Sequence, residues 1–119
     1  MFRDTIQKMI DRLDGAGGAG GVLMGFDGIA VDSYVRPGTV DVQTIGMELT
    51  HIIGEIRRSA QGAKIGGLRE VQVKTDKLAL LIHLVTDDYF LVFGVPPESN
   101  LGKARYLLRL LAPQIRAQL

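Results

Sequence analysis

The chain has 119 residues, a size typical of one domain with one hydrophobic core. Its 14 basic and 13 acidic residues leave a formal charge of +1, which excludes a strong field that would attract nucleic acid or an anionic membrane. Cysteine is absent, so we expect no disulfides, no thiolate metal site and a cytoplasmic location. The longest apolar stretch, 78–85, is far shorter than the ~18 residues of a membrane-spanning helix. We therefore expect one domain over residues 1–119 whose partners are recognised by shape.

The first part of the chain predicts a helix and a hairpin. Apolar residues recur at helical spacing over 2–13, which indicates an amphipathic helix. After a glycine-rich segment, the short apolar segments 22–26 and 29–35 are typical of paired strands. The Asp27-Gly28 dipeptide between them favours a type I′ turn, in which both central residues have positive φ. We therefore expect a β-hairpin soon after the first helix.

A second, longer helix is predicted near 42–60. Thr39 or Asp41 precedes its first apolar residue and can cap it. Its apolar residues form one stripe, which we expect to face a sheet: Val42, Ile45, Leu49, Ile52, Ile53, Ile56 and Ala60.

The second half of the chain predicts three strands and a final helix. Segment 68–74 alternates polar and apolar residues, as a half-buried edge strand does. Segments 78–85 and 89–95 are almost continuously apolar, which is typical of strands covered on both faces at the centre of a sheet. A helix over 101–119 follows. The element order is therefore α-β-β-α-β-β-β-α, an α/β arrangement in which helices must cover both faces of the sheet.

The glycine-rich segment matches a cofactor motif by its letters alone. Gly15, Gly17 and Gly20 fit the G-x-G-x-x-G pattern of dinucleotide-binding loops. That motif needs a strand before the glycines and a helix after them, so that the pyrophosphate lies at a helix N-terminus. Here the helix comes first and the strand follows. We therefore interpret the segment as a connector and expect no nucleotide cofactor.

Candidates for catalysis are sparse. Glu48 and His51 have the spacing of half a di-iron motif, but the chain has no second copy. His83 lies on an apolar strand, where histidine is more often a core or interface residue than a metal ligand. No serine lies in a nucleophile-elbow motif. We expect neither a metal site nor an active site of its own.

One surface of the second helix is a candidate for protein binding. The face opposite the apolar stripe carries Met47, His51, Gly54 and Arg58, with Arg57 beside it. Exposed helical faces are usually rich in Lys and Glu, so Met47 near a small Gly54 suggests that another chain approaches there. The alternative is a solvated face with an incidental methionine.

Arginines of the last helix form another exposed set. Arg105, Arg109 and Arg116 align beside its apolar stripe. We interpret them as side chains packed along the core edge, with Asp4 and Asp11 of the first helix as candidate ion-pair partners.

The element order, the central strand pair and the start of the last helix together resemble the roadblock/dynein light chain family, whose fold is longin-like and profilin-like. Bacterial members that regulate a Ras-like motility GTPase have a similar Ser-Leu-Gly-x-x-Arg step after their last strand. Ser99, Leu101, Gly102 and Arg105 correspond to it, with Asn100 inserted. The resemblance implies a five-stranded antiparallel sheet, with the second helix on one face and the first and third on the other.

The resemblance also implies how the chain works. It implies a homodimer formed through the third strand and second helix, with an interface that includes Leu68, Glu70, Val71, Gln72, Val73, Met47 and Gly54. Family members are mostly non-catalytic platforms for small GTPases or motor subunits, and some stimulate GTP hydrolysis. The expected partner is therefore a Ras-like small GTPase, which would bind at Met47, His51, Gly54, Arg57 and Arg58. A structural or scaffold subunit without a GTPase partner is the alternative, and a small-molecule-binding module is the third.

Overall fold

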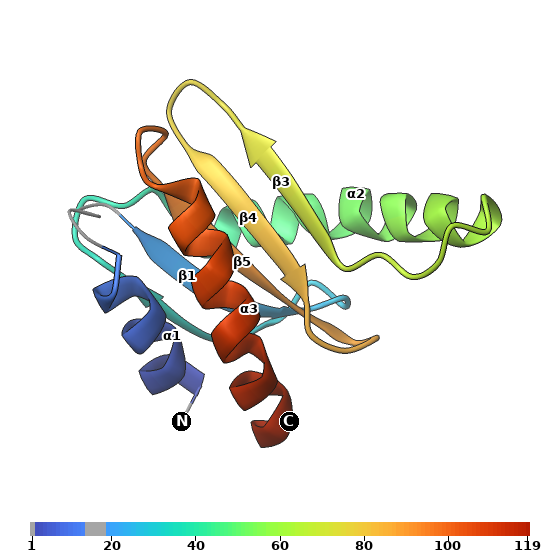
Figure 1. Cartoon of the computed structure of the whole chain (residues 1–119), viewed down its shortest axis with the longest axis horizontal. Helices are drawn as coiled ribbons and strands as arrows, with labels where there is room; N and C mark the ends of the chain where they lie inside the picture. The colour runs from blue at the N-terminus through green and yellow to red at the C-terminus, as the bar shows by residue number, and fades with distance from the viewer. Residues whose placement is uncertain (1, 14–18) are drawn as a thin grey trace.

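The computed structural model describes residues 2–13 and 19–119, and its elements follow the predicted order (Figure 1). The described residues form three helices and five strands, in this order along the chain: α1 (Phe2–Asp11), β1 (Gly20–Gly25), β2 (Ala30–Val35), α2 (Val42–Gly62), β3 (Glu70–Lys74), β4 (Ala79–Leu84), β5 (Tyr89–Val95) and α3 (Leu101–Gln118). A helix therefore precedes the glycine-rich segment and a strand follows it, as the sequence indicates. Gly15 and Gly17, on which the connector interpretation also depends, lie outside the described residues.

The five strands form one antiparallel sheet in the order β2-β1-β5-β4-β3. β5 lies at the centre, and its Val92 pairs with Val22 of β1 on one side and Ile82 of β4 on the other. Only β2 and β3 are edge strands. The continuously apolar segments are thus central, and the alternating segment is at an edge, as predicted.

Helices cover both faces of the sheet, as expected. On one face, α1 and α3 pack side by side on Leu23, Leu91 and Phe93. On the other face, α2 packs alone on a second core that includes Val22, Phe90 and Val92. The hydrophobic effect therefore holds three layers together around a sheet whose central side chains are buried on both sides.

Side-chain caps set the starts of the two long helices. The Asp41 carboxylate accepts a hydrogen bond from the Thr44 N–H (3.1 Å), and it is the cap of α2. The Asn100 side chain accepts one from the Lys103 N–H (3.0 Å) and caps α3. Pro113 lies inside α3, which continues to Gln118.

The apolar stripe of α2 does not face the sheet along its whole length. Val42 and Ile53 are buried, but Ile52 and Ile56 are 53% and 37% exposed. A helix of 21 residues is about 31 Å long, whereas five strands span only about 19 Å from the first to the last. Figure 1 shows the C-terminal half of α2 projecting past β3, beyond the edge of the sheet. The expectation that all seven apolar residues face the sheet is therefore wrong for Ile52 and Ile56.

The turn between β1 and β2 also differs from the prediction. Gly28 has a φ of 85°, but Asp27 does not have a positive φ, so the turn is not type I′. The Gly28 N–H donates to the Gly25 carbonyl (2.9 Å), and the Gly25 N–H donates to the Ile29 carbonyl (2.9 Å). Three residues, 26–28, therefore lie between the hydrogen-bonded Gly25 and Ile29. The Phe26 ring of this turn packs against Phe90, with the ring centroids 4.8 Å apart.

Candidate functional site

The exposed face of α2 borders a shallow groove. Met47, His51, Gly54 and Arg58 follow one another at helical spacing and line it from one side. The β1–β2 turn lines it from the other side through Phe26, Asp27 and Gly28. The groove has a volume of about 390 Å³. The structure therefore brings the predicted partner-binding residues together, and Arg57 lies at the base of the same groove.

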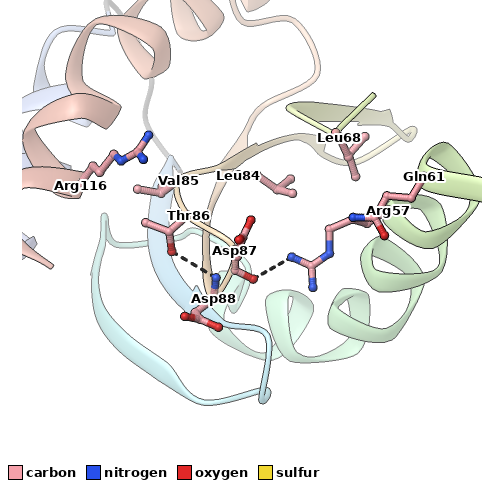
Figure 2. Close-up of a pocket in the computed structure, with 10 residues that line it drawn as sticks. Arg57, Gln61, Leu68, Leu84, Val85, Thr86, Asp87, Asp88 and Arg116 are labelled. Carbon is pink, nitrogen blue, oxygen red and sulfur yellow. Dashed lines mark hydrogen bonds between the residues drawn. The ribbon is translucent and has the colours of Figure 1, made fainter. Parts of the chain in front are cut away.

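Arg57 ties α2 to two turns of the sheet. Its guanidinium lies over the Phe26 ring at 3.9 Å from the centroid, a cation–π contact. It also donates to the Asp87 carbonyl at 2.7 Å, which Figure 2 shows as a dashed line. Arg57 therefore positions the β1–β2 turn against α2, and less of it is free for a partner than of Arg58.

The charged groups of the groove lie on the solvent side of α2. His51 has an 82% exposed side chain, and its Nε2 lies 3.7 Å from the Glu55 carboxylate. Arg58 forms an ion pair with the same carboxylate. This exposed face of α2 thus offers the thioether of Met47, the imidazole of His51 and the guanidinium of Arg58. The last two share one counter-charge, the Glu55 carboxylate. Such a mixture suits a protein surface, since exposed ion pairs are weak and can exchange partners.

The described residues were compared with the requirements of a metal site and of a membrane-spanning helix. They contain no cluster of histidine and carboxylate groups placed to hold a metal ion. None of the helices within 2–13 and 19–119 is both long and apolar enough to cross a bilayer.

Five of the seven predicted dimer residues, Leu68 and 70–73, lie along the open edge of the sheet at or just before β3, whereas Met47 and Gly54 line the α2 groove. Leu68, Val71 and Val73 are partly buried and pack toward α2, whereas Gln72 is exposed. The Leu84 N–H donates to the Arg69 carbonyl at 2.9 Å. Hydrogen-bonded pairs alternate along an antiparallel ladder, so the main-chain groups of Glu70 and Gln72 point away from β4. This edge therefore presents unpaired backbone donors and acceptors.

The Glu70 side chain instead faces α3. It accepts hydrogen bonds from Arg105 (2.6 Å) and Arg109 (3.1 Å). The Arg105 hydrogen bond, with a smaller effect of Arg109, holds the Glu70 pKa below its usual value although burial opposes this. The Asp11 carboxylate pairs with Arg36 at 2.9 Å. The expectation that the α3 arginines pair with the first helix is therefore wrong for Arg105 and Arg109, because the edge strand supplies a nearer carboxylate.

His83 completes this cluster. Its Nδ1 is buried without a hydrogen-bond partner and lies 4.0 Å from the Glu70 carboxylate. Burial, which disfavours the charged imidazolium, lowers the His83 pKa from its ordinary value, and Glu70 partly opposes this. The prediction that His83 is a hydrogen-bonded core or interface residue is wrong for the core, because its side chain is 20% exposed and no hydrogen bond satisfies its Nδ1. Its place in an interface stays a prediction.

Known proteins share this fold and part of this sequence. No protein-family model matches the chain, and no curated protein matches it. Among solved structures, MglC from Myxococcus xanthus is 34% identical over 99% of this chain and 98% of that chain, with a TM-score of 0.70. A roadblock/LC7 domain from Streptomyces avermitilis has a TM-score of 0.80 at 15% identity, covering 96% of this chain and 93% of its own. The chain belongs to the roadblock/LC7 family.

A third roadblock-type structure, Myxococcus xanthus MglB, has a TM-score of 0.77 at 16% identity and covers 96% of this chain and 86% of its own. At these low identities, the MglB and Streptomyces structures show the fold alone. The roadblock-like step at the start of α3 has a structural role in this chain. The Ser99 N–H donates to the Pro96 carbonyl (3.0 Å), and Arg105 binds Glu70. The step therefore starts α3 and joins it to the edge strand.

Two features of this roadblock chain were not apparent from its sequence. The β1–β2 turn forms half of the groove, yet Phe26 and Asp27 lie far from α2 in the chain. The exposure of Ile52 and Ile56 depends on where the sheet ends. An aromatic residue directly before an Asp-Gly turn was the one available signal for the turn, since a large ring there must pack on something.

Proposed function

We propose that this roadblock-family chain is a non-catalytic, cytoplasmic homodimer of one domain, residues 1–119, that binds and regulates a Ras-like small GTPase. The observation that carries the proposal is the groove between α2 and the β1–β2 turn, where Met47, His51 and Arg58 are exposed around the half-buried Gly54. The similarity to MglC and the family resemblance support the class of partner.

The homodimer is supported by two surfaces that a single chain leaves uncovered. β3 is an open strand edge, which folded proteins rarely leave unprotected. Beside it, the projecting part of α2 exposes Ile52 and Ile56. A second copy related by twofold symmetry pairs β3 with β3 and brings each projecting helix over the partner's sheet. One operation thus covers both surfaces.

In such a dimer, two copies of α2 form one platform. In each copy, the face of α2 that carries Met47, His51 and Arg58 points away from the sheet, so it remains free for a GTPase. Met47 supplies an adaptable apolar contact, and Arg58 can leave Glu55 for a carboxylate of the partner. GTPase activation would then act by positioning the GTPase's own residues.

The test is binding of a Ras-like GTPase encoded beside this chain. Arg58→Glu combined with His51→Ala should weaken binding by about tenfold or more if these residues are anchors. Both side chains are exposed, so unfolding and dimer mass should not change. Arg12→Glu is the matched control, because it reverses an exposed arginine that lines none of the described pockets. Binding that survives the double change but is lost on replacing Arg105 and Arg109 would place the GTPase on the other side of the sheet.

A structural subunit without a GTPase is the second candidate, and the second edge strand favours it. β2 exposes Val31 (43%) and Val35 (39%), and Ile29 before it is 65% exposed. A dimer through β3 leaves this edge open. A solution mass above that of a dimer, together with no binding to the neighbouring GTPase, would favour this candidate.

A further inference from the structure

A second groove lies on the α3 side of the sheet, at the end of β4. It is lined by Arg69, which precedes β3, and by Arg109 and Arg116 of α3. Leu84 and the exposed Pro113 supply apolar surface beside these arginines, whereas Val85 and Ala112, which also line the groove, are buried. Its volume is about 500 Å³. Figure 2 shows Arg116 reaching from α3 toward Val85 and Thr86, on the side of the strand end away from Arg57.

The groove concentrates positive charge in a chain whose formal charge is only +1. No carboxylate lies among its lining residues. Arg109 shares the Glu70 carboxylate with Arg105, so its charge is partly offset. Within the described residues, Arg69 and Arg116 have no acidic side chain within 4.0 Å. Two whole cationic charges are therefore available to a ligand, with Arg109 near them.

The shape and the apolar surface indicate which anion fits. Guanidinium groups bind carboxylates through two parallel hydrogen bonds, and they remain charged at all relevant pH values. The groove volume is more than ten times the about 30 Å³ that one water molecule occupies in liquid water. A small inorganic anion would leave Leu84 and Pro113 uncovered. A peptide with carboxylates on both sides of an apolar residue would cover them and meet the arginines together.

We propose that this groove binds an acidic segment of a partner protein, with carboxylates at Arg69 and Arg116 and an apolar side chain on Leu84 and Pro113. No residue of α2 lines this groove, so the site is independent of the proposed GTPase contact on the exposed face of α2. A chain that uses both would hold two different partners on opposite faces of one sheet.

Fluorescence anisotropy tests the proposal with the labelled peptide Gly-Glu-Glu-Leu-Glu-Glu-Gly and the full chain. We expect saturable binding that weakens as salt rises. Arg69→Gln combined with Arg116→Gln should weaken binding at least tenfold, whereas Arg12→Gln should change it less than twofold. Replacing the peptide leucine with serine keeps its charge and should weaken binding severalfold, because the apolar surface then stays uncovered. Far-ultraviolet circular dichroism checks that the variants are folded.

Several results would overturn the proposal. Absence of saturable binding at millimolar peptide would do so without any variant. An equal loss with Arg12→Gln would show general attraction to the surface. If inorganic phosphate displaces the peptide at equimolar concentration, or the serine peptide binds as well as the leucine peptide, the groove is a simple anion site and takes no peptide. The same peptide with lysines in place of its glutamates should not bind, and binding of both would contradict the role of charge.

Discussion

The two helical layers of this protein differ in what they bury. α3, with 18 residues, contributes six buried residues to the core, whereas the longer α2, with 21, contributes only three. α3 has α1 beside it, and the two pack together on one face of the sheet. α2 stands alone on its face and projects past β3. The α1–α3 layer therefore buries more of its residues, and α2 leaves more apolar and charged residues available for binding.

The sharpest test of this difference compares an apolar residue from each layer. Leu107→Ala in α3 should lower the free energy of unfolding by about 2–5 kcal/mol, because the side chain is 1% exposed and its loss leaves a cavity. Ile52→Ala in α2 should cost less than about 1 kcal/mol in the monomer, because half of that side chain is already in water. Urea unfolding at nanomolar protein concentration measures both. Equal losses would show that α2 is packed as fully as α3.

The open edge gives the next largest effect. The Gln72 N–H points away from β4, so Gln72→Pro removes a donor that only another chain can use. We expect it to shift the dimer toward monomer by tenfold or more in dissociation constant, while Gln72→Ala leaves the mass unchanged. Val71→Pro is the contrasting variant. Val71 is in the alternate register, so its proline removes a bond to β4 and should lower the stability of the chain itself.

Light scattering across micromolar concentrations separates these cases. A wild-type chain that is monomeric throughout would contradict the homodimer. A Gln72→Pro variant that stays dimeric would show that α2, and not the β3 edge, holds the copies together.

The sequence predicts this architecture well because its signals are local. Alternation in 68–74 and continuous apolarity in 78–85 depend on the faces that each strand buries. Periodicity could not predict that Ile52 and Ile56 are exposed, since an apolar stripe shows which side of a helix is apolar and carries no information on how far the sheet extends.

Only the α2 side of the groove could be predicted from the sequence, for a similar reason. Spacing aligns Met47 with His51, but only the folded hairpin brings Phe26 to Arg57.

Within the groove, Arg57 and Arg58 should separate structure from binding. Arg57→Ala removes the ring contact with Phe26 and the hydrogen bond to the Asp87 carbonyl, at a cost of about 1–2 kcal/mol in unfolding free energy. Arg58→Ala removes one exposed ion pair and should cost less than about 0.5 kcal/mol. Thermal unfolding of the two variants side by side measures this. The same stability for both would mean that Arg57 does not hold the β1–β2 turn.

The smallest effect should appear in the dependence of stability on pH. Burial lowers the His83 pKa below the ordinary 6.5, so the unfolded chain binds a proton there before the folded chain does. The contribution of His83 to stability is therefore complete above pH 6.5 and is lost as pH falls through its folded pKa. Glu70 also has a lowered pKa, but its contribution is lost only below its ordinary 4.5. Between pH 7.5 and 5.5 the histidine thus acts alone of the two.

His83→Gln should remove that loss, so the free energy of unfolding should fall less between pH 7.5 and 5.5 in the variant than in the wild type. His51→Gln is the matched control, because it removes the chain's other histidine, whose side chain is 82% exposed. Urea unfolding at pH 7.5, 6.5 and 5.5 gives the three slopes. If the His83→Gln slope equals that of the wild type, the charged imidazolium is accommodated beside Glu70 in the folded chain. The Glu70 carboxylate, which raises the His83 pKa, would then outweigh burial and the nearby Arg109, which both lower it.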